Sequence, residues 1–232
     1  MQLRKTIKEK LSDVDFINIP DLLSCDTRSW DGANIAKAYF DDVVPHLRAM
    51  DFDFTKDLPI KDKLREYNIK EVLVIEGDPP QSMLYQVYPT ISTDIIKKFS
   101  EEMPEITVYA GIDQYRSSMK EEEYRIRRKQ LAGAKGFFTQ PFFDMRYLEM
   151  YADLLDGLDI YWGVSPVLSE RSVSYWRNKN NVIFPKDFEP TLEWNIEFAR
   201  KVIEFARKHN HNVYLMPIKA KIMPYLEGVF AK

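Results

Sequence analysis

Seven short apolar runs, separated by longer amphipathic stretches, constrain the fold of this 232-residue chain most strongly. The runs are rich in β-branched and aromatic residues and are nearly unbroken rather than alternating with polar positions. Such runs are typical of strands that are buried on both faces, as in a parallel sheet covered by helices. The expected strands are residues 15–20, 43–47, 71–77, 106–112, 136–143, 159–166 and 212–218.

The stretches between the runs predict helices. Residues 92–103 begin with Ser-Thr-Asp, which can cap a helix, and residues 118–132 begin with a capping-box spacing. Residues 191–208 place apolar side chains at spacings of three and four, which form one stripe along a helix. Repeated alternation of strand and helix predicts a single α/β domain over residues 1–232.

Two α/β architectures compete, an open doubly wound sheet and a closed barrel. The chain has no Gly-rich nucleotide-binding turn and no P-loop, which an open sheet of this kind usually carries. Polar residues lie at the carboxyl ends of the expected strands, and in a barrel these ends converge on one mouth. We therefore expect a TIM-type (β/α) barrel, incomplete or atypical because about seven strands are recognisable. The strand-end residues are Asp21, His46, Asp78, Asp113, Gln140 and Ser165.

Composition excludes several classes of protein. The 33 Lys and Arg residues do not exceed the 36 Asp and Glu residues, so the basic surface of a nucleic-acid binder is not expected. No run is long enough to span a membrane, which predicts a soluble, cytoplasmic protein. Cys25 is the single cysteine, and three histidines lack metal-binding spacing, so we expect neither a disulfide framework nor a metal site.

Two motifs make the chain recognisable, GDPP at 77–80 and TQPFFD at 139–144. Either motif alone is a weak signal, but the pair at this spacing is fairly specific. Together with further segments they resemble the methylenetetrahydrofolate reductase family, whose barrels bind FAD. The further segments are DFINIPDL (15–22), PHL (45–47), VYAG (108–111), RRKQLAGA (127–134) and WGVSPV (162–167).

The resemblance implies hydride transfer from NAD(P)H through FAD to 5,10-methylenetetrahydrofolate, a reaction of one-carbon metabolism. It places Asp78 beside the flavin and Gln140 on the folate pterin, and these two are the residues implied for catalysis. Both side chains are expected to face the same bound ring. The residues implied for cofactor binding are His46, Glu76, Gly77, Asp78, Ala110, Arg116, Arg128 and Lys129.

Departures from the family pattern put turnover in doubt. Glu76 stands where the family has an arginine, which reverses a charge next to the cofactor. The family's general acid is a glutamate on its first strand, and this chain is expected to begin after that strand, with Met1–Leu11 as the helix that follows it. Protonation of the leaving nitrogen requires an acid. The carboxylates that can replace it are Asp21, Glu76, Asp113 and Asp144.

Two other functions stay open. The chain can be a non-catalytic or altered folate- or pterin-binding member that acts with a methyl-transfer partner. Alternatively, Lys219 after the last expected strand can form a Schiff base in a lyase or aldolase. The motif residues also have purely structural interpretations: Asp78 can shape a turn, and Arg128 and Lys129 can complement a helix dipole.

A missing first strand leaves a sheet edge with unpaired backbone groups. We therefore expect the edge to be covered by a terminal segment such as residues 224–230, by a second copy in a homo-oligomer, or by a partner chain.

Overall fold

The computed structural model describes residues 14–80, 82, 84–218 and 220–231. These residues form two compact units. Unit 1 contains the described residues up to Gly111 together with Arg128–Lys135. Unit 2 contains Ile112–Arg127 and the described residues from Gly136 onward. Helix α5 (Met119–Ala132) begins in unit 2 and its last residues belong to unit 1.

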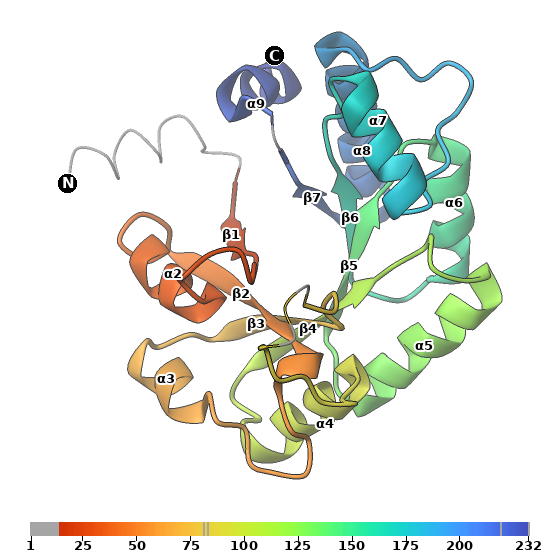
Figure 1. Cartoon of the computed structure of the whole chain (residues 1–232). Helices are drawn as coiled ribbons and strands as arrows, with labels where there is room; N and C mark the ends of the chain where they lie inside the picture. Colours follow the sequence, from red (N-terminus) through yellow and green to blue (C-terminus); the bar gives the residue numbers. More distant parts are fainter. Residues whose placement is uncertain (1–13, 81, 83, 219, 232) are drawn as a thin grey trace. The chain divides into compact units, whose positions relative to one another are not determined.

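Unit 1 is built on parallel strands that pair in chain order (Figure 1). Its strands are β1 (Phe16–Ile19), β2 (Asp42–Arg48), β3 (Glu71–Ile75) and β4 (Thr107–Ile112). Its helices are α2 (Ser29–Ala36), α3 (Lys61–Glu66), α4 (Ser92–Glu102) and the short 3-10 helix η1 (Ala49–Asp51). Helix α2 packs on β1 and β2, and α4 packs on β3.

Unit 2 repeats the same pattern with parallel pairing of its strands. Its strands are β5 (Gly136–Pro141), β6 (Ile160–Val164) and β7 (Asn212–Leu215). Its further helices are α6 (Met145–Leu154), α7 (Glu170–Lys179), α8 (Leu192–His209) and α9 (Ile222–Phe230).

The expected architecture is confirmed. All seven predicted strands occur, helices α4, α5 and α8 lie where the sequence predicts them, and the fold is an incomplete α/β barrel with seven strands in the described chain. An ordinary barrel of this class has eight. The helix predicted over Met1–Leu11 lies outside the described residues, and the single-domain organisation stays a prediction.

Burial explains why the apolar runs fold as strands. Every residue of β6 is buried, and so is every residue of β2 after its first. A strand covered on both faces removes its whole apolar surface from water, at roughly 25 cal/mol per Å². Unit 2 also buries a cluster beside β5 and β6, formed by Phe143, Val167, Val173, Trp176 and Val182.

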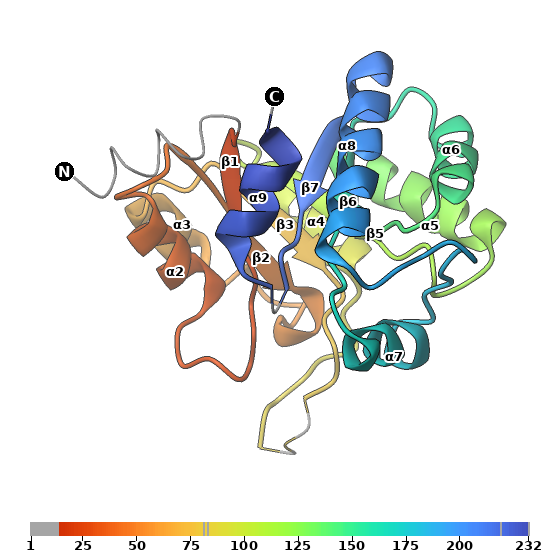
Figure 2. The same cartoon turned by 90° about the horizontal axis from the view of Figure 1, so that it is seen from above.

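The segment 224–230 lies in α9, which packs on α8; both are drawn in blue in Figure 2. Arg200 of α8 donates to the carbonyl oxygens of Gly228 at 2.6 Å and Ala231 at 3.1 Å. Within the described residues β1 pairs with β2 alone and β7 with β6 alone. What covers the outer edges of β1 and β7 stays a prediction. No helix among the described residues is long and apolar enough to cross a membrane.

Candidate functional site

The polar residues predicted at the strand ends do lie there. In unit 1, Asp21 follows β1, His46 lies two residues before the end of β2, and Asp78 follows β3. In unit 2, Gln140 is the last residue but one of β5. Asp78 and Gln140 thus belong to different units, and their predicted approach to one ring stays a prediction.

An ionic cluster occupies the strand ends of unit 1. The Asp21 carboxylate accepts a hydrogen bond from Arg28 Nε at 3.0 Å and from the Ser29 backbone N–H at 3.1 Å. Arg28 Nη2 also donates to Asp51 at 2.7 Å. The Asp21 side chain is 1% exposed, so Arg28 compensates a carboxylate that is almost fully removed from water.

His46 and Arg48 point to the same face of β2, because side chains two apart on a strand share a face. Both are buried, and among the described residues neither His46 Nε2 nor Arg48 Nε has a hydrogen-bond partner. Burial lowers the pKa of His46 to about 4, against the opposing effect of the Asp21 charge. The imidazole is therefore neutral at pH 7, and its Nε2 is buried without a hydrogen bond in the described chain.

Arg48 joins the end of β2 to the turn after β3. Its Nη2 donates to the Asp78 carbonyl oxygen at 2.8 Å, and its Nε lies 3.4 Å from an Asp51 carboxylate oxygen. Gly77 adopts a φ of +88°, and a Cβ there would lie 3.1 Å from Arg48 Cβ and Nε. The turn therefore requires glycine both for its backbone conformation and for its contact with Arg48.

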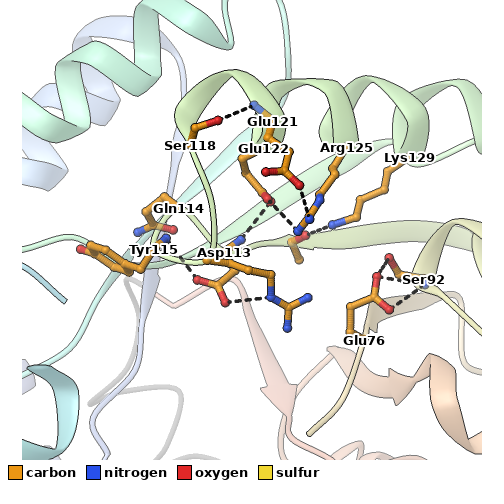
Figure 3. A network of polar contacts seen from close by, with 12 residues as sticks. Glu76, Ser92, Asp113, Gln114, Tyr115, Ser118, Glu121, Glu122, Arg125 and Lys129 are labelled. Carbon is orange, nitrogen blue, oxygen red and sulfur yellow. Dashed lines mark hydrogen bonds and ion pairs between the residues drawn. The ribbon is translucent and has the colours of Figure 1, made fainter. Parts of the chain in front are cut away.

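The Glu76 side chain has a partner that explains a negative charge at this position. Its carboxylate accepts from the backbone N–H of Ser92 at 3.2 Å and from the Ser92 hydroxyl at 2.7 Å (Figure 3). Ser92 is the first residue of α4, where unpaired N–H groups and the helix dipole favour an anion. Glu76 thus holds α4 to the end of β3, and its role in cofactor binding stays a prediction.

Of the two cations of α5 that are predicted to bind the cofactor, one is buried and one is exposed. Lys129 is buried and its Nζ donates to the Gly111 carbonyl oxygen at 2.6 Å, at the end of β4 (Figure 3). Arg128 is exposed. Ala110 is fully buried within β4. The cofactor-binding role of the two cations and of Ala110 stays a prediction.

Arg116 belongs to unit 2 and lies in a tight turn that follows the end of β4. Its Nε is 3.7 Å from the Asp113 carboxylate, and both side chains are partly exposed. The same carboxylate accepts from the Tyr115 backbone N–H at 3.2 Å, and the Asp113 N–H donates to Glu122 (Figure 3). Asp113 therefore shapes the turn, as short acidic side chains often do.

Gln140 is held by a residue that the sequence analysis missed. The side-chain amide of Gln114 makes hydrogen bonds to both the N–H and the carbonyl of Gln140. The Gln140 side chain itself is half-buried and has no hydrogen bond within the described chain. Arg48 and Asp51 were also missed, although a charged residue inside an apolar strand, two positions after His46, is a readable signal.

None of the carboxylates considered as a replacement acid is free. Asp21 pairs with Arg28, Glu76 with Ser92, and Asp113 with its own turn, as described above. Asp144 caps α6 and binds Arg146 Nη2 at 2.6 Å, and the hydrogen bonds from Arg146 hold the pKa of Asp144 below its usual range. A general acid at neutral pH needs a raised pKa instead.

Metal-binding side chains and Lys219 were the remaining candidates for chemistry considered from the sequence. No group of three or more metal-binding side chains occurs among the described residues. Lys219, considered for a Schiff base, lies outside them.

Comparison with known proteins supports a distant relationship to a methylenetetrahydrofolate reductase. No family model matches the chain. The curated 5,10-methylenetetrahydrofolate reductase of Buchnera aphidicola subsp. Schizaphis graminum is 22% identical over 147 residues, which cover 61% of this chain and 50% of the relative. The chain therefore spans about half the length of the curated relative that it matches.

Solved structures with a similar fold belong to different enzymes. An oxaloacetate acetylhydrolase has a TM-score of 0.60 at 9% identity, over 95% of this chain and 73% of that chain. An aldo-keto reductase from Bacillus halodurans, in its holo form, has a TM-score of 0.51 at 11% identity, over 99% and 81% of the two chains. These similarities support the barrel class and carry no information on the reaction.

Proposed function

We propose that this chain is a divergent flavoprotein of the methylenetetrahydrofolate reductase type. It binds FAD and a folate-type substrate, and it passes a hydride from NAD(P)H to 5,10-methylenetetrahydrofolate in cytoplasmic one-carbon metabolism. One structural observation carries this proposal: near the end of β2 the buried His46 Nε2 lacks a hydrogen-bond partner in the described chain, beside Arg48, whose Nε is ion-paired with Asp51 but not hydrogen-bonded. The motif pair and the distant curated relative support it further.

These residues fit the edge of a flavin ring. A buried polar group without a partner costs free energy, so His46 Nε2 favours a ligand that supplies the missing hydrogen bond. Arg48 Nε on the same strand face makes no hydrogen bond in the described chain but has the Asp51 carboxylate 3.4 Å away. The neutral His46 imidazole can donate or accept, and Arg48 can only donate. Gly77 adds no side chain beside Arg48, which keeps the turn before Asp78 close to this face.

The remaining roles follow from the chemistry that the reaction needs. A bound flavin supplies the acceptance and delivery of the hydride, and the protein tunes it through hydrogen bonds and nearby charge. We assign the ring contact to His46 and the nearby charge to Asp78. Gln140 can donate to and accept from the amide edge of a pterin, because its side chain offers both groups. Glu76, Ala110, Arg116, Arg128 and Lys129 complete the proposed cofactor-binding set.

An absorption spectrum of the purified protein, before and after addition of FAD, tests this function. We expect a yellow protein whose flavin absorbance bleaches when NADH or NADPH is added. A protein that stays colourless and takes up no FAD contradicts the proposal.

A matched pair of histidine variants locates the site. His46→Leu should weaken FAD binding about tenfold, because it removes one hydrogen bond of roughly 1.4 kcal/mol. His209→Leu replaces an exposed histidine of α8 and should leave the affinity unchanged. Equal effects of the two variants would exclude β2 as the flavin site.

A non-catalytic folate-binding protein is the second candidate, and the paired carboxylates favour it. Asp21, Glu76, Asp113 and Asp144 all have partners, so none of the four carboxylates considered as a replacement is free to open the folate ring as an acid. In this case the protein binds tetrahydrofolate and acts with a methyl-transfer partner. Single-turnover reduction of methylenetetrahydrofolate by the FAD-loaded protein decides between the two: turnover supports the reductase, and binding without turnover supports the second candidate.

A further inference from the structure

The backbone of β5 departs from regular pairing at the residues around Gln140. Phe138 pairs with Tyr161 and Pro141 with Gly163, so two residues of β5, Thr139 and Gln140, lie opposite a single residue of β6. A bulge of this kind bends a strand and redirects a side chain, and it leaves backbone groups without their ladder partners. The side chains around the bulge must therefore supply these hydrogen bonds.

Two side chains supply hydrogen bonds around the bulge, and one glycine allows the close approach of β6. The Thr139 hydroxyl accepts from the Gly163 backbone N–H at 2.8 Å, on the β6 side of the bulge. A Cβ on Gly163 would lie 2.6 Å from the Thr139 carbonyl oxygen and 2.8 Å from that of Gln140. Only glycine lets β6 approach the bulge so closely.

Gln114 supplies the hydrogen bonds at Gln140 itself. Its Nε2 donates to the Gln140 carbonyl oxygen at 2.7 Å, and its Oε1 accepts from the Gln140 N–H at 3.1 Å. One side-chain amide thus satisfies both backbone groups of Gln140, in place of a strand. Gln114 is 1% exposed, so water cannot replace it.

Tyrosine hydroxyls make hydrogen bonds to the backbone on both sides of the Gln114–Gln140 contact. Tyr147 of α6 donates its hydroxyl to the Gln114 carbonyl oxygen at 2.6 Å. The hydroxyl of Tyr115 donates to the Pro141 carbonyl oxygen at 2.8 Å. The residue that holds Gln140 is therefore itself fixed, which is what a precisely placed binding group requires.

This arrangement leaves the side-chain amide of Gln140, at the end of β5, without a hydrogen bond in the described chain. Gln140 is the one residue of the strand that is not fully buried. Its backbone is fixed by Gln114, while its side chain has no hydrogen bond within the described chain. A buried network that fixes a backbone and leaves the side chain without a partner is suited to presenting that side chain to a ligand.

We infer that Gln114 is a positioning residue, which orients the Gln140 side-chain amide toward the amide edge of a pterin. That the ligand is a pterin rests on the proposed function, whereas the hold of Gln114 on the Gln140 backbone is independent of it. The inference therefore has two parts that separate experiments address.

The first experiment measures amide hydrogen exchange at the Gln140 N–H by NMR, without ligand. Gln114→Leu should accelerate this exchange at least tenfold relative to the wild type. Gln114→Glu retains the acceptor and should preserve part of the protection. Asn195→Leu, a matched loss of a buried amide from α8 that bonds to Val167, should leave the Gln140 exchange unchanged. Unchanged exchange in Gln114→Leu overturns the positioning role.

The second experiment measures the affinity for tetrahydrofolate by isothermal titration, on variants whose folded state is first verified by circular dichroism. Gln114→Leu and Gln140→Ala should each lower the affinity about tenfold. In the Gln140→Ala background, Gln114→Leu should have no further effect, since it acts through Gln140. A purely structural loss would lower the affinity equally in both backgrounds and would overturn the inference.

The two experiments separate the possible failures. If the wild type binds no tetrahydrofolate but Gln114→Leu accelerates exchange at Gln140, the proposed function and the pterin fail while the positioning role stands. If Gln114→Leu does not fold, Gln114→Glu is used in both experiments. The Glu variant should then show faster exchange and weaker binding than the wild type, and wild-type values in both would overturn the inference.

Discussion

The two units hold their strand ends with different kinds of side chain. In unit 1 the ends of β1 and β2 are joined by charges, with Arg28 between the carboxylates of Asp21 and Asp51. In unit 2 the corresponding positions are held by neutral amides: Gln114 bonds to the backbone of Gln140 and Asn195 to that of Val167. Both solutions satisfy buried polar groups, but they depend on different physical forces.

The difference matters for how each unit responds to its surroundings. A buried charge is costly without its partner, so removing one member of an ionic cluster is expected to destabilise strongly. A buried amide is neutral, and its loss costs the desolvation of the groups it leaves unpaired. The ionic cluster of unit 1 should therefore be sensitive to charge and pH, and the amide hydrogen bonds of unit 2 should not.

The largest expected effect is the loss of the central cation of unit 1. Arg28→Met leaves the carboxylates of Asp21 and Asp51 without it, and their side chains are 1% and 13% exposed. We expect a decrease of about 4 kcal/mol in the free energy of unfolding at pH 7, measured by urea denaturation.

An exposed ion pair provides the control. Lys208→Met breaks a pair with Glu204 on α8 in which both side chains are more than half exposed. This change should cost less than about 0.5 kcal/mol. A loss of similar size in both variants would mean that burial does not increase the contribution of the unit 1 cluster to the free energy of unfolding.

The pH dependence of stability is the next largest effect, and it depends on His46. Burial lowers the pKa of His46 from 6.5 to about 4 in the folded state. As the pH falls below 6.5 the unfolded chain binds a proton that the folded chain does not. The stabilisation present above pH 6.5 is therefore lost progressively down to about pH 4, by about 3 kcal/mol in total.

Comparison with a variant isolates this contribution from that of the carboxylates. The free energy of unfolding is measured from pH 7 to pH 4 for the wild type and for His46→Gln. The wild type should lose about 3 kcal/mol more than the variant over this range. Parallel curves would show that His46 titrates normally and is not buried as the structure describes.

The smallest of the three effects is expected for a buried amide of unit 2. The Asn195 amide accepts from the Val167 N–H at 2.9 Å and donates to the Val167 carbonyl oxygen at 3.0 Å, both in a buried environment. Asn195→Leu leaves these groups unpaired and should lower the free energy of unfolding by about 2 kcal/mol. Measurements at pH 5 and pH 8 should give the same loss, and a strong pH dependence of this loss would contradict the neutral character of the Asn195–Val167 contact.

Much of the fold could be predicted because its signals are local. An unbroken run such as EVLVI forms β3 because it can bury both faces, and this requirement is visible in the run itself. Strand ends also follow from the runs, so the polar residues beside them could be predicted as site candidates. The partners of those residues could not be predicted, and Glu76 is an example. From the sequence its negative charge differs from the family pattern at a cofactor site, whereas in the structure Glu76 accepts a hydrogen bond from Ser92 at the start of α4.

The missed residues have a common cause. Gln114 lies 26 residues from Gln140, and Arg48 lies 30 residues from Asp78. Nothing in the neighbouring sequence of Gln114 distinguishes an amide that bonds to a distant backbone from one that faces water. Arg48 is partly different, because an arginine inside an apolar strand must find buried partners, although the sequence does not identify them.

The order of strands and helices, the barrel class and the positions of the strand ends were determined by the sequence alone, since burial and local propensity act on residues that are close along the chain. Only the tertiary structure decided which side chain satisfies which buried group, because these bonds form between segments that folding brings together. The ionic cluster of unit 1 and the amide hydrogen bonds of unit 2 are both of this second kind.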